Sequence, residues 1–128
     1  MNLNSLPPDL RAALAAVQNK LAFSVVVLDL RELGAFTNFF LICSAASTPQ
    51  VQAIHDEVEH ELEKLGRRAV QREGYNAGQW ALMDYGSFVV HIFSEQGRGF
   101  YDLERLWRNA KRYQVPAPAA ARRQAGQR

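Results

Sequence analysis

The run QWALMDYGSFVVHIFS, residues 79–94, consists of two stretches rich in β-branched and aromatic residues on either side of a single glycine, Gly86. This composition is typical of strands, and a glycine between two short strands favours a tight turn. We therefore predict an antiparallel hairpin of strands 79–85 and 87–94. Alternation along the first strand places Trp80, Leu82 and Asp84 on one face of the sheet and Tyr85 on the other.

Three further strands are predicted upstream of the hairpin. Residues 23–30 (FSVVVLDL) and 39–45 (FFLICSA) are β-branched, aromatic or otherwise apolar. The second of these is apolar on both faces, which indicates a central position in its sheet. Charges alternate with uncharged side chains over residues 67–73, as in an edge strand.

Three helices complete the prediction. The first follows Pro7 and Pro8, where a missing N–H is tolerated. The second begins at Ser47, which with Gln50 three residues later resembles a capping box, and ends at Gly66. The third opens at residues 97–99 and would place Phe100, Leu103, Trp107 and Ala110 on one face.

The predicted order, α-β-β-α-β-β-β-α, indicates an α/β (α+β) domain with a single mixed five-stranded sheet and helices packed on it. We expect this domain to span residues 1–112. Residues 113–128, rich in Ala, Pro and Arg, are expected to form a disordered basic tail. Charge is divided unevenly, because residues 105–128 hold seven of the fifteen Lys and Arg residues and none of the thirteen acids. A basic end on an acidic body can hold anionic partners weakly through counterion release.

The sequence predicts neither a catalytic centre nor a metal or cofactor site. His55 and His60 are five residues apart on one helix and point about 140° apart, so they cannot share a metal. His91 lies in a predicted strand, and the single cysteine, Cys43, is most simply a core residue. A nucleotidyltransferase, the main enzymatic alternative, needs paired carboxylates on a strand, and Asp29 stands alone. With no disulfide framework, membrane span or leader pattern, a cytoplasmic protein is expected.

From residue 73 onward the sequence resembles the ribosomal silencing factor family, also called iojap or RsfS. The resemblance rests on a series of anchors in a fixed order: Glu73-Gly74, Trp80, Asp84-Tyr85-Gly86, Val89-Val90-His91, Arg98-Gly99-Phe100-Tyr101, Leu103-Glu104 and Leu106-Trp107. Upstream, residues 39–47 followed by Gln50-Val51 are similar to the family's strand, serine cap and helix. The similarity extends over roughly residues 10–110.

The resemblance implies a mixed α/β domain that is a homodimer when free and has no enzymatic activity. It also implies binding to the fourteenth protein of the large ribosomal subunit, on the face that meets the small subunit. A domain of about 110 residues, about 25–30 Å across, would block subunit joining there by steric exclusion and so repress translation. On this interpretation Glu73, Trp80, Leu82, Asp84 and Tyr85 form the partner-binding patch.

Two other interpretations stay open at this point. The competing structural interpretation of the patch makes Trp80 a packing residue and Asp84 a cap of the turn at Gly86. An RNA-binding module acting through residues 105–128 is the second functional alternative beside the nucleotidyltransferase, and the basic tail could add a weak contact to ribosomal RNA.

Overall fold

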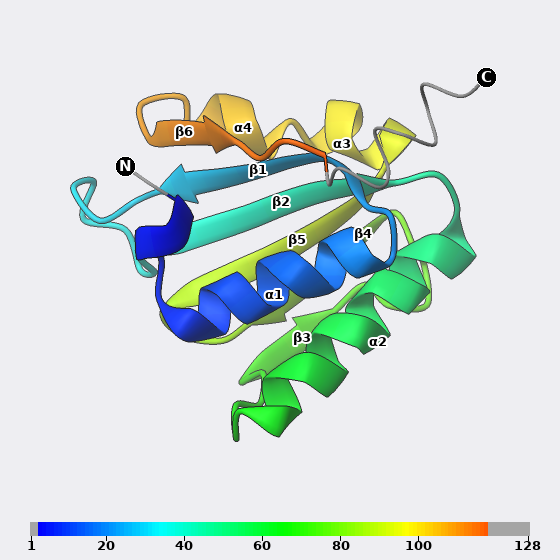
Figure 1. The fold of residues 1–128 in the computed structure, drawn as a ribbon. Coiled ribbons are helices and arrows are strands. Elements are labelled where there is room, and N and C mark those ends of the chain that lie inside the picture. Colours follow the sequence, from blue (N-terminus) through cyan, green and yellow to red (C-terminus); the bar gives the residue numbers. More distant parts are fainter. Residues whose placement is uncertain (1–2, 118–128) are drawn as a thin grey trace.

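The computed structural model describes residues 3–117, which form one sheet with helices on both faces (Figure 1). The elements in chain order are the 3-10 turn η1 (Leu3–Ser5), α1 (Pro8–Asn19), β1 (Phe23–Asp29), β2 (Phe39–Ala45), α2 (Thr48–Lys64), β3 (Gln71–Glu73), β4 (Trp80–Asp84), β5 (Phe88–Ser94), α3 (Glu95–Tyr101), α4 (Leu103–Leu106) and β6 (Lys111–Gln114). The mixed α and β architecture with a single sheet confirms the predicted fold class.

The sheet has the strand order β3-β4-β5-β2-β1-β6. Its pairs are antiparallel except β2 with β5, which run parallel in the centre. All seven residues of β2 are buried, as its apolar composition predicted. The predicted hairpin is also confirmed, since β4 and β5 pair antiparallel and Tyr85 and Phe88 close the turn with a backbone hydrogen bond of 2.9 Å.

Helices α1 and α2 lie against one face of the sheet, as Figure 1 shows. Their buried side chains join those of alternate strand residues in the larger core, which includes Leu10, Ile54, Leu41, Met83 and Tyr85. The opposite face carries a smaller core, in which Leu103 packs on residues of β1, β2 and β5. Trp80, Leu82 and Trp107 border this smaller core and are only partly buried.

The start of α2 is held as the capping box predicts. Ser47 Oγ accepts a hydrogen bond of 3.2 Å from the backbone N–H of Gln50, which satisfies one of the free N–H groups of the first turn. The Gln50 side chain accepts from the backbone N–H of Ala46 and donates to the carbonyls of Lys20 and Leu21. Gln50 therefore ties the end of α1 to the start of α2.

The C-terminal part differs from the prediction in two ways. The sheet has six strands, because β6 pairs antiparallel with β1. The strand runs past the expected domain boundary at residue 112, since Tyr113 and Gln114 belong to β6 and Val115 donates a hydrogen bond to the carbonyl of Val25. The remainder of the expected tail, 118–128, lies outside the described residues.

The predicted third helix is also broken in two. Asp102 adopts the left-handed conformation (φ 47°) between α3 and α4. The break lets Leu103 point into the smaller core while Phe100 stays 82% exposed. Because the turn lies inside an apparently continuous apolar pattern, periodicity alone could not reveal it.

Candidate protein-interaction surface

Four of the five predicted patch residues lie on one face of the sheet, the face that α1 and α2 do not cover. The register pairs Glu73 with Leu82 and Leu82 with His91, so these three form one row across β3, β4 and β5. Trp80 and Asp84 flank Leu82 on the same face of β4, and all three are half-exposed. We call Glu73, Trp80, Leu82 and Asp84, together with the neighbouring Tyr101, the β4 surface.

Trp80 is fixed by its neighbours. Its ring stacks on Phe93 at 5.1 Å between centroids and contacts Tyr101 of α3 at 4.7 Å. Its indole N–H donates a hydrogen bond of 3.0 Å to Nδ1 of His91. These contacts fix the ring, which stays partly exposed, as aromatic anchors at protein interfaces usually are.

His91 is buried, with 3% of its surface exposed, among aromatic rings. Phe40 meets it edge to face at 4.5 Å between centroids. Burial lowers its pKa from 6.5 to about 3. The ring is therefore neutral near pH 7, and because Nδ1 accepts from Trp80, the proton is on Nε2. Nε2 is the one buried side-chain polar atom without a hydrogen-bond partner among residues 3–117.

Asp84 and Glu73 provide the negative charge of the β4 surface. Asp84 Oδ1 accepts a hydrogen bond of 2.8 Å from the backbone N–H of Gly86, so the structural interpretation of this residue as a turn cap is confirmed. The cap uses one carboxylate oxygen and leaves the residue half-exposed. Glu73 is exposed on the edge strand β3, where its carboxylate accepts from the side chain of Gln71.

Tyr85 does not belong to this surface. It is 2% exposed, stacks on Phe88 at 5.2 Å between centroids and lies in the larger core under α1 and α2. Burial raises the pKa of its hydroxyl to about 12. Strand alternation had already placed Tyr85 on the opposite face, and the structure follows that alternation rather than the motif.

Sequence reasoning missed the exposure of three large side chains outside β4. Tyr101 is 40% exposed, and Phe36 and Leu106 are 73% and 77% exposed. Phe36 lies near Phe40, which also contacts Trp107 at 5.5 Å between ring centroids. Helical periodicity predicted a buried face for the final helix that did not include Leu106, and the structure leaves this residue exposed.

The other groups considered for chemistry are occupied or inert. His55, Asp56 and Glu59 bring possible ligand atoms within 4.8 Å of one another, but Asp56 accepts from the Tyr75 hydroxyl and Glu59 pairs with Arg72. These contacts account for the cluster without a cation. Cys43 is fully buried, and burial raises its thiol pKa to about 12, as expected of a core residue. Within residues 3–117, no helix combines the length and the apolar character needed to cross a membrane.

Comparison with known proteins gives a consistent result. The family model described as "Ribosomal silencing factor during starvation" matches residues 4–128. The ribosomal silencing factor RsfS of Halalkalibacterium halodurans is 40% identical over 101 residues, which cover 79% of this chain and 86% of that protein. The chloroplastic protein Iojap of Zea mays is 36% identical over 95 residues, covering 74% of this chain and 41% of that protein.

Two solved structures share the fold. A crystal structure from Bacillus halodurans superposes with a TM-score of 0.73 at 37% identity and covers 83% of this chain and 96% of its own. A crystal structure from Chromobacterium violaceum gives a TM-score of 0.76 at 28% identity and covers 93% and 98% of the two chains. The likeness therefore extends over nearly all of the described fold.

Proposed function

This chain belongs to the ribosomal silencing factor family, and from that premise we propose that it represses translation by binding the large ribosomal subunit through the subunit's fourteenth protein. The bound domain blocks joining of the small subunit by occupying its place. The action is steric and needs no metal, cofactor or catalysis. We further propose that the free protein is a homodimer and that it acts in the cytoplasm.

The observation that carries the proposal is the β4 surface. Trp80 is held by Phe93 and His91 and is partly exposed, like Leu82 on the same face of β4. A fixed aromatic ring with an adjacent aliphatic side chain is the kind of centre around which binding energy gathers in protein interfaces. Its fixed position also lowers the entropy lost when a partner binds.

The charge around this centre suits a basic partner. Glu73 and Asp84 lie at the edges of the apolar centre, and cations on the partner would find both at the rim. Ribosomal proteins are typically basic, so the complementary charge would speed encounter and orient the two surfaces. The acidic side chains of α2 lie on the opposite face of the sheet and contribute to the charge of the body rather than to this surface: Asp56, Glu57, Glu59, Glu61 and Glu63.

The first test is subunit joining. Purified large subunits, with the protein in excess, are mixed with small subunits and separated by sedimentation. We expect fewer joined ribosomes, with the protein travelling with the large subunit. Sedimentation with the small subunit, or a normal yield of joined ribosomes, would contradict the proposal.

The second test locates the contact. Leu82→Arg puts a cation at the centre of the β4 surface and should weaken binding to the fourteenth protein at least thirtyfold, about 2 kcal/mol, because a basic partner is repelled. Asp84→Asn keeps an acceptor for the Gly86 N–H but removes the charge, so it should weaken binding less and raise its salt tolerance.

Leu65→Arg is the matched control, since Leu65 is 52% exposed at the end of α2, away from the β4 surface. It should bind like the original protein. Melting temperatures of all three variants are measured alongside affinity. Normal binding by Leu82→Arg, or equal loss in Leu65→Arg, would mean that the contact lies elsewhere.

A further inference from the structure

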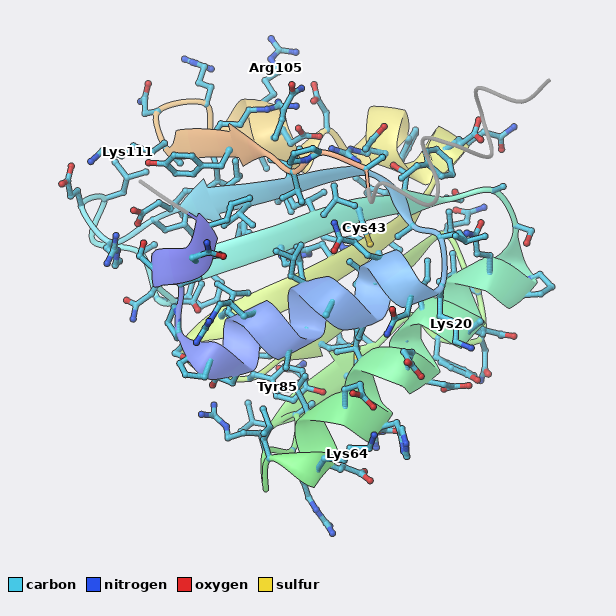
Figure 2. All side chains as sticks on the ribbon, viewed as in Figure 1. Lys20, Cys43, Lys64, Tyr85, Arg105 and Lys111 are labelled. Atoms are coloured by element: carbon cyan, nitrogen blue, oxygen red, sulfur yellow. The ribbon has the colours of Figure 1, made fainter. Side chains whose placement is uncertain are left out.

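A second exposed surface shares Tyr101 with the β4 surface but is chemically unlike it. The segment from α3 to α4 encloses a shallow hollow of about 420 Å³, lined by Tyr101, Asp102, Arg105, Leu106, Arg108 and Asn109. In Figure 2, Arg105 extends from this segment away from the sheet. We call Phe100, Arg105, Leu106 and Arg108 the α4 surface.

The two arginines of the α4 surface are available to a ligand. Arg105 and Arg108 are exposed, and neither forms an ion pair with any other residue in the range 3–117. The cations that follow them are partly neutralised, since Lys111 pairs with Glu32 at 3.5 Å and Arg112 with Glu104 at 2.7 Å. One acid, Asp102, lines the hollow, and no acid follows Glu104 in the sequence.

Two large apolar side chains of the same segment are also exposed. Leu106, which lines the hollow, is 77% exposed, and Phe100, next to Tyr101 at the edge of the hollow, is 82% exposed. Phe100 contacts Tyr101 in a T-shaped arrangement, with 5.1 Å between the ring centroids. An exposed aromatic ring on the same segment as unpaired arginines is a combination that proteins use to hold single-stranded nucleic acid, by stacking a base and neutralising its phosphates.

We propose that the α4 surface binds a single-stranded or looped segment of RNA, with Arg105 and Arg108 on phosphates and a base stacked on Phe100. The charge of the opposite face also favours this location for an anionic polymer. Helix α2, on that other face of the sheet, carries five acids and would repel RNA there. This inference rests on the proposed function for its location: Tyr101 touches Trp80 at 4.7 Å and also lines the hollow, so the RNA would be ribosomal and adjacent to the docked protein.

The test separates RNA from protein contacts by using two binding partners, whole large subunits and the isolated fourteenth protein. The variant Arg105→Gln/Arg108→Gln is compared with the control Arg11→Gln/Lys20→Gln, which removes two exposed cations from the region of α1 and gives the same net charge. We expect the first variant to bind large subunits about tenfold more weakly at 100 mM salt. Its plot of log affinity against log salt should be shallower by about 1.4, since each phosphate contact on single strands contributes about 0.7.

Binding to the isolated protein should be unchanged in both double variants, and the control should match the original protein throughout. A normal salt slope in Arg105→Gln/Arg108→Gln would overturn the inference. Equal weakening toward the isolated protein would overturn it too, because the α4 surface would then be a protein contact.

If the original protein binds neither partner, the proposed function fails, and a 20-nucleotide single-stranded RNA then decides the RNA inference separately. The inference is supported if the original protein binds this RNA and the arginine variant shows a shallower salt dependence. Absence of binding overturns the inference. Phe100→Ala should weaken binding to this RNA at least fivefold without changing the slope, while Phe100→Tyr retains it. Normal RNA binding by Phe100→Ala would contradict the stacking contact and would overturn the inference as stated.

Discussion

At the scale of single residues, the β4 surface depends on a histidine that no partner would touch. His91 accepts the indole N–H of Trp80 and is otherwise enclosed by Phe40 and Phe93. Its unpaired Nε2–H is a buried donor that lost its hydrogen bonds to water on folding, and such a group costs about 1–3 kcal/mol. His91 therefore orients Trp80, but its unpaired donor lowers the free energy of unfolding.

His91→Phe tests the protonation of this ring. Its folded pKa of about 3 lies below the ordinary 6.5, so between these values the unfolded protein binds more protons than the folded one. The free energy of unfolding of the original protein should therefore fall as the pH drops through this window. By pH 5 the loss from His91 should be about 2 kcal/mol relative to pH 7.5, and the variant should lack it.

Urea unfolding at pH 7.5 and pH 5.0 measures this difference. His55, whose pKa is also lowered by burial, remains in both proteins and cancels from the comparison. At pH 7.5 the variant loses both the unpaired donor and the hydrogen bond from Trp80, two effects of opposite sign, so its free energy of unfolding should stay within about 1–2 kcal/mol of the original value. The same acid sensitivity in both proteins would show that His91 titrates normally in the folded state.

At the scale of elements, the turn from β3 into β4 decides where Trp80 lies. Gly74 has φ +84°, and a Cβ there would lie 1.8 Å from the carbonyl oxygen of Trp80. Backbone, rather than a movable side chain, stands in the way. Glycine is therefore needed at position 74 both for the positive φ and for the close approach of the Trp80 backbone. A larger residue would displace β4 and its tryptophan.

Gly74→Ala should lower the free energy of unfolding by about 3 kcal/mol or more and weaken partner binding through displacement of Trp80. Gly34→Ala is the matched control, because Gly34 also has a positive φ, +66°, but has no atom within 4 Å of the added Cβ. It should cost about 1–2 kcal/mol, from backbone strain alone. Equal losses in the two variants, measured by chemical denaturation, would show that the contact with Trp80 adds nothing.

At the scale of the whole molecule, β6 closes the sheet on the side of β1. Its residues pair with Val26–Asp29, and Tyr113 and Val115 pack on the larger core. Without β6, the β1 edge would present unpaired backbone groups to solvent and to other chains. The C-terminal part of the chain thus divides into a strand that belongs to the domain and the stretch 118–128 beyond it.

Two truncations separate these parts. Deleting 118–128 should leave the melting temperature nearly unchanged, because this stretch has no apolar residue larger than Ala or Pro to bury, and should reduce RNA affinity at low salt. Deleting 111–128 should lower the free energy of unfolding by about 3 kcal/mol or more and promote aggregation. Thermal unfolding and light scattering would measure both effects, and a stable, monodisperse product of the longer deletion would contradict the role of β6.

The sequence by itself determined the elements whose signals are local. Period-two patterns and Gly86 predicted the hairpin, Ser47 with Gln50 predicted the start of α2, and apolar composition predicted that β2 is central. These signals are readable because alternation, caps and turns depend on neighbours within a few residues. The same alternation correctly separated Tyr85 from Trp80, Leu82 and Asp84, although the family motif groups them.

The tertiary structure alone decided which local patterns are paired and which faces stay open. The four residues of β6 are polar except for Tyr113, and only the free edge of β1 makes them a strand. The left-handed turn at Asp102 follows from the need to send Leu103 into the smaller core, and it leaves Phe100 and Leu106 exposed. The contact between Trp80 and His91 joins two strands through side chains eleven residues apart. Such features depend on packing between distant segments, which no local pattern records.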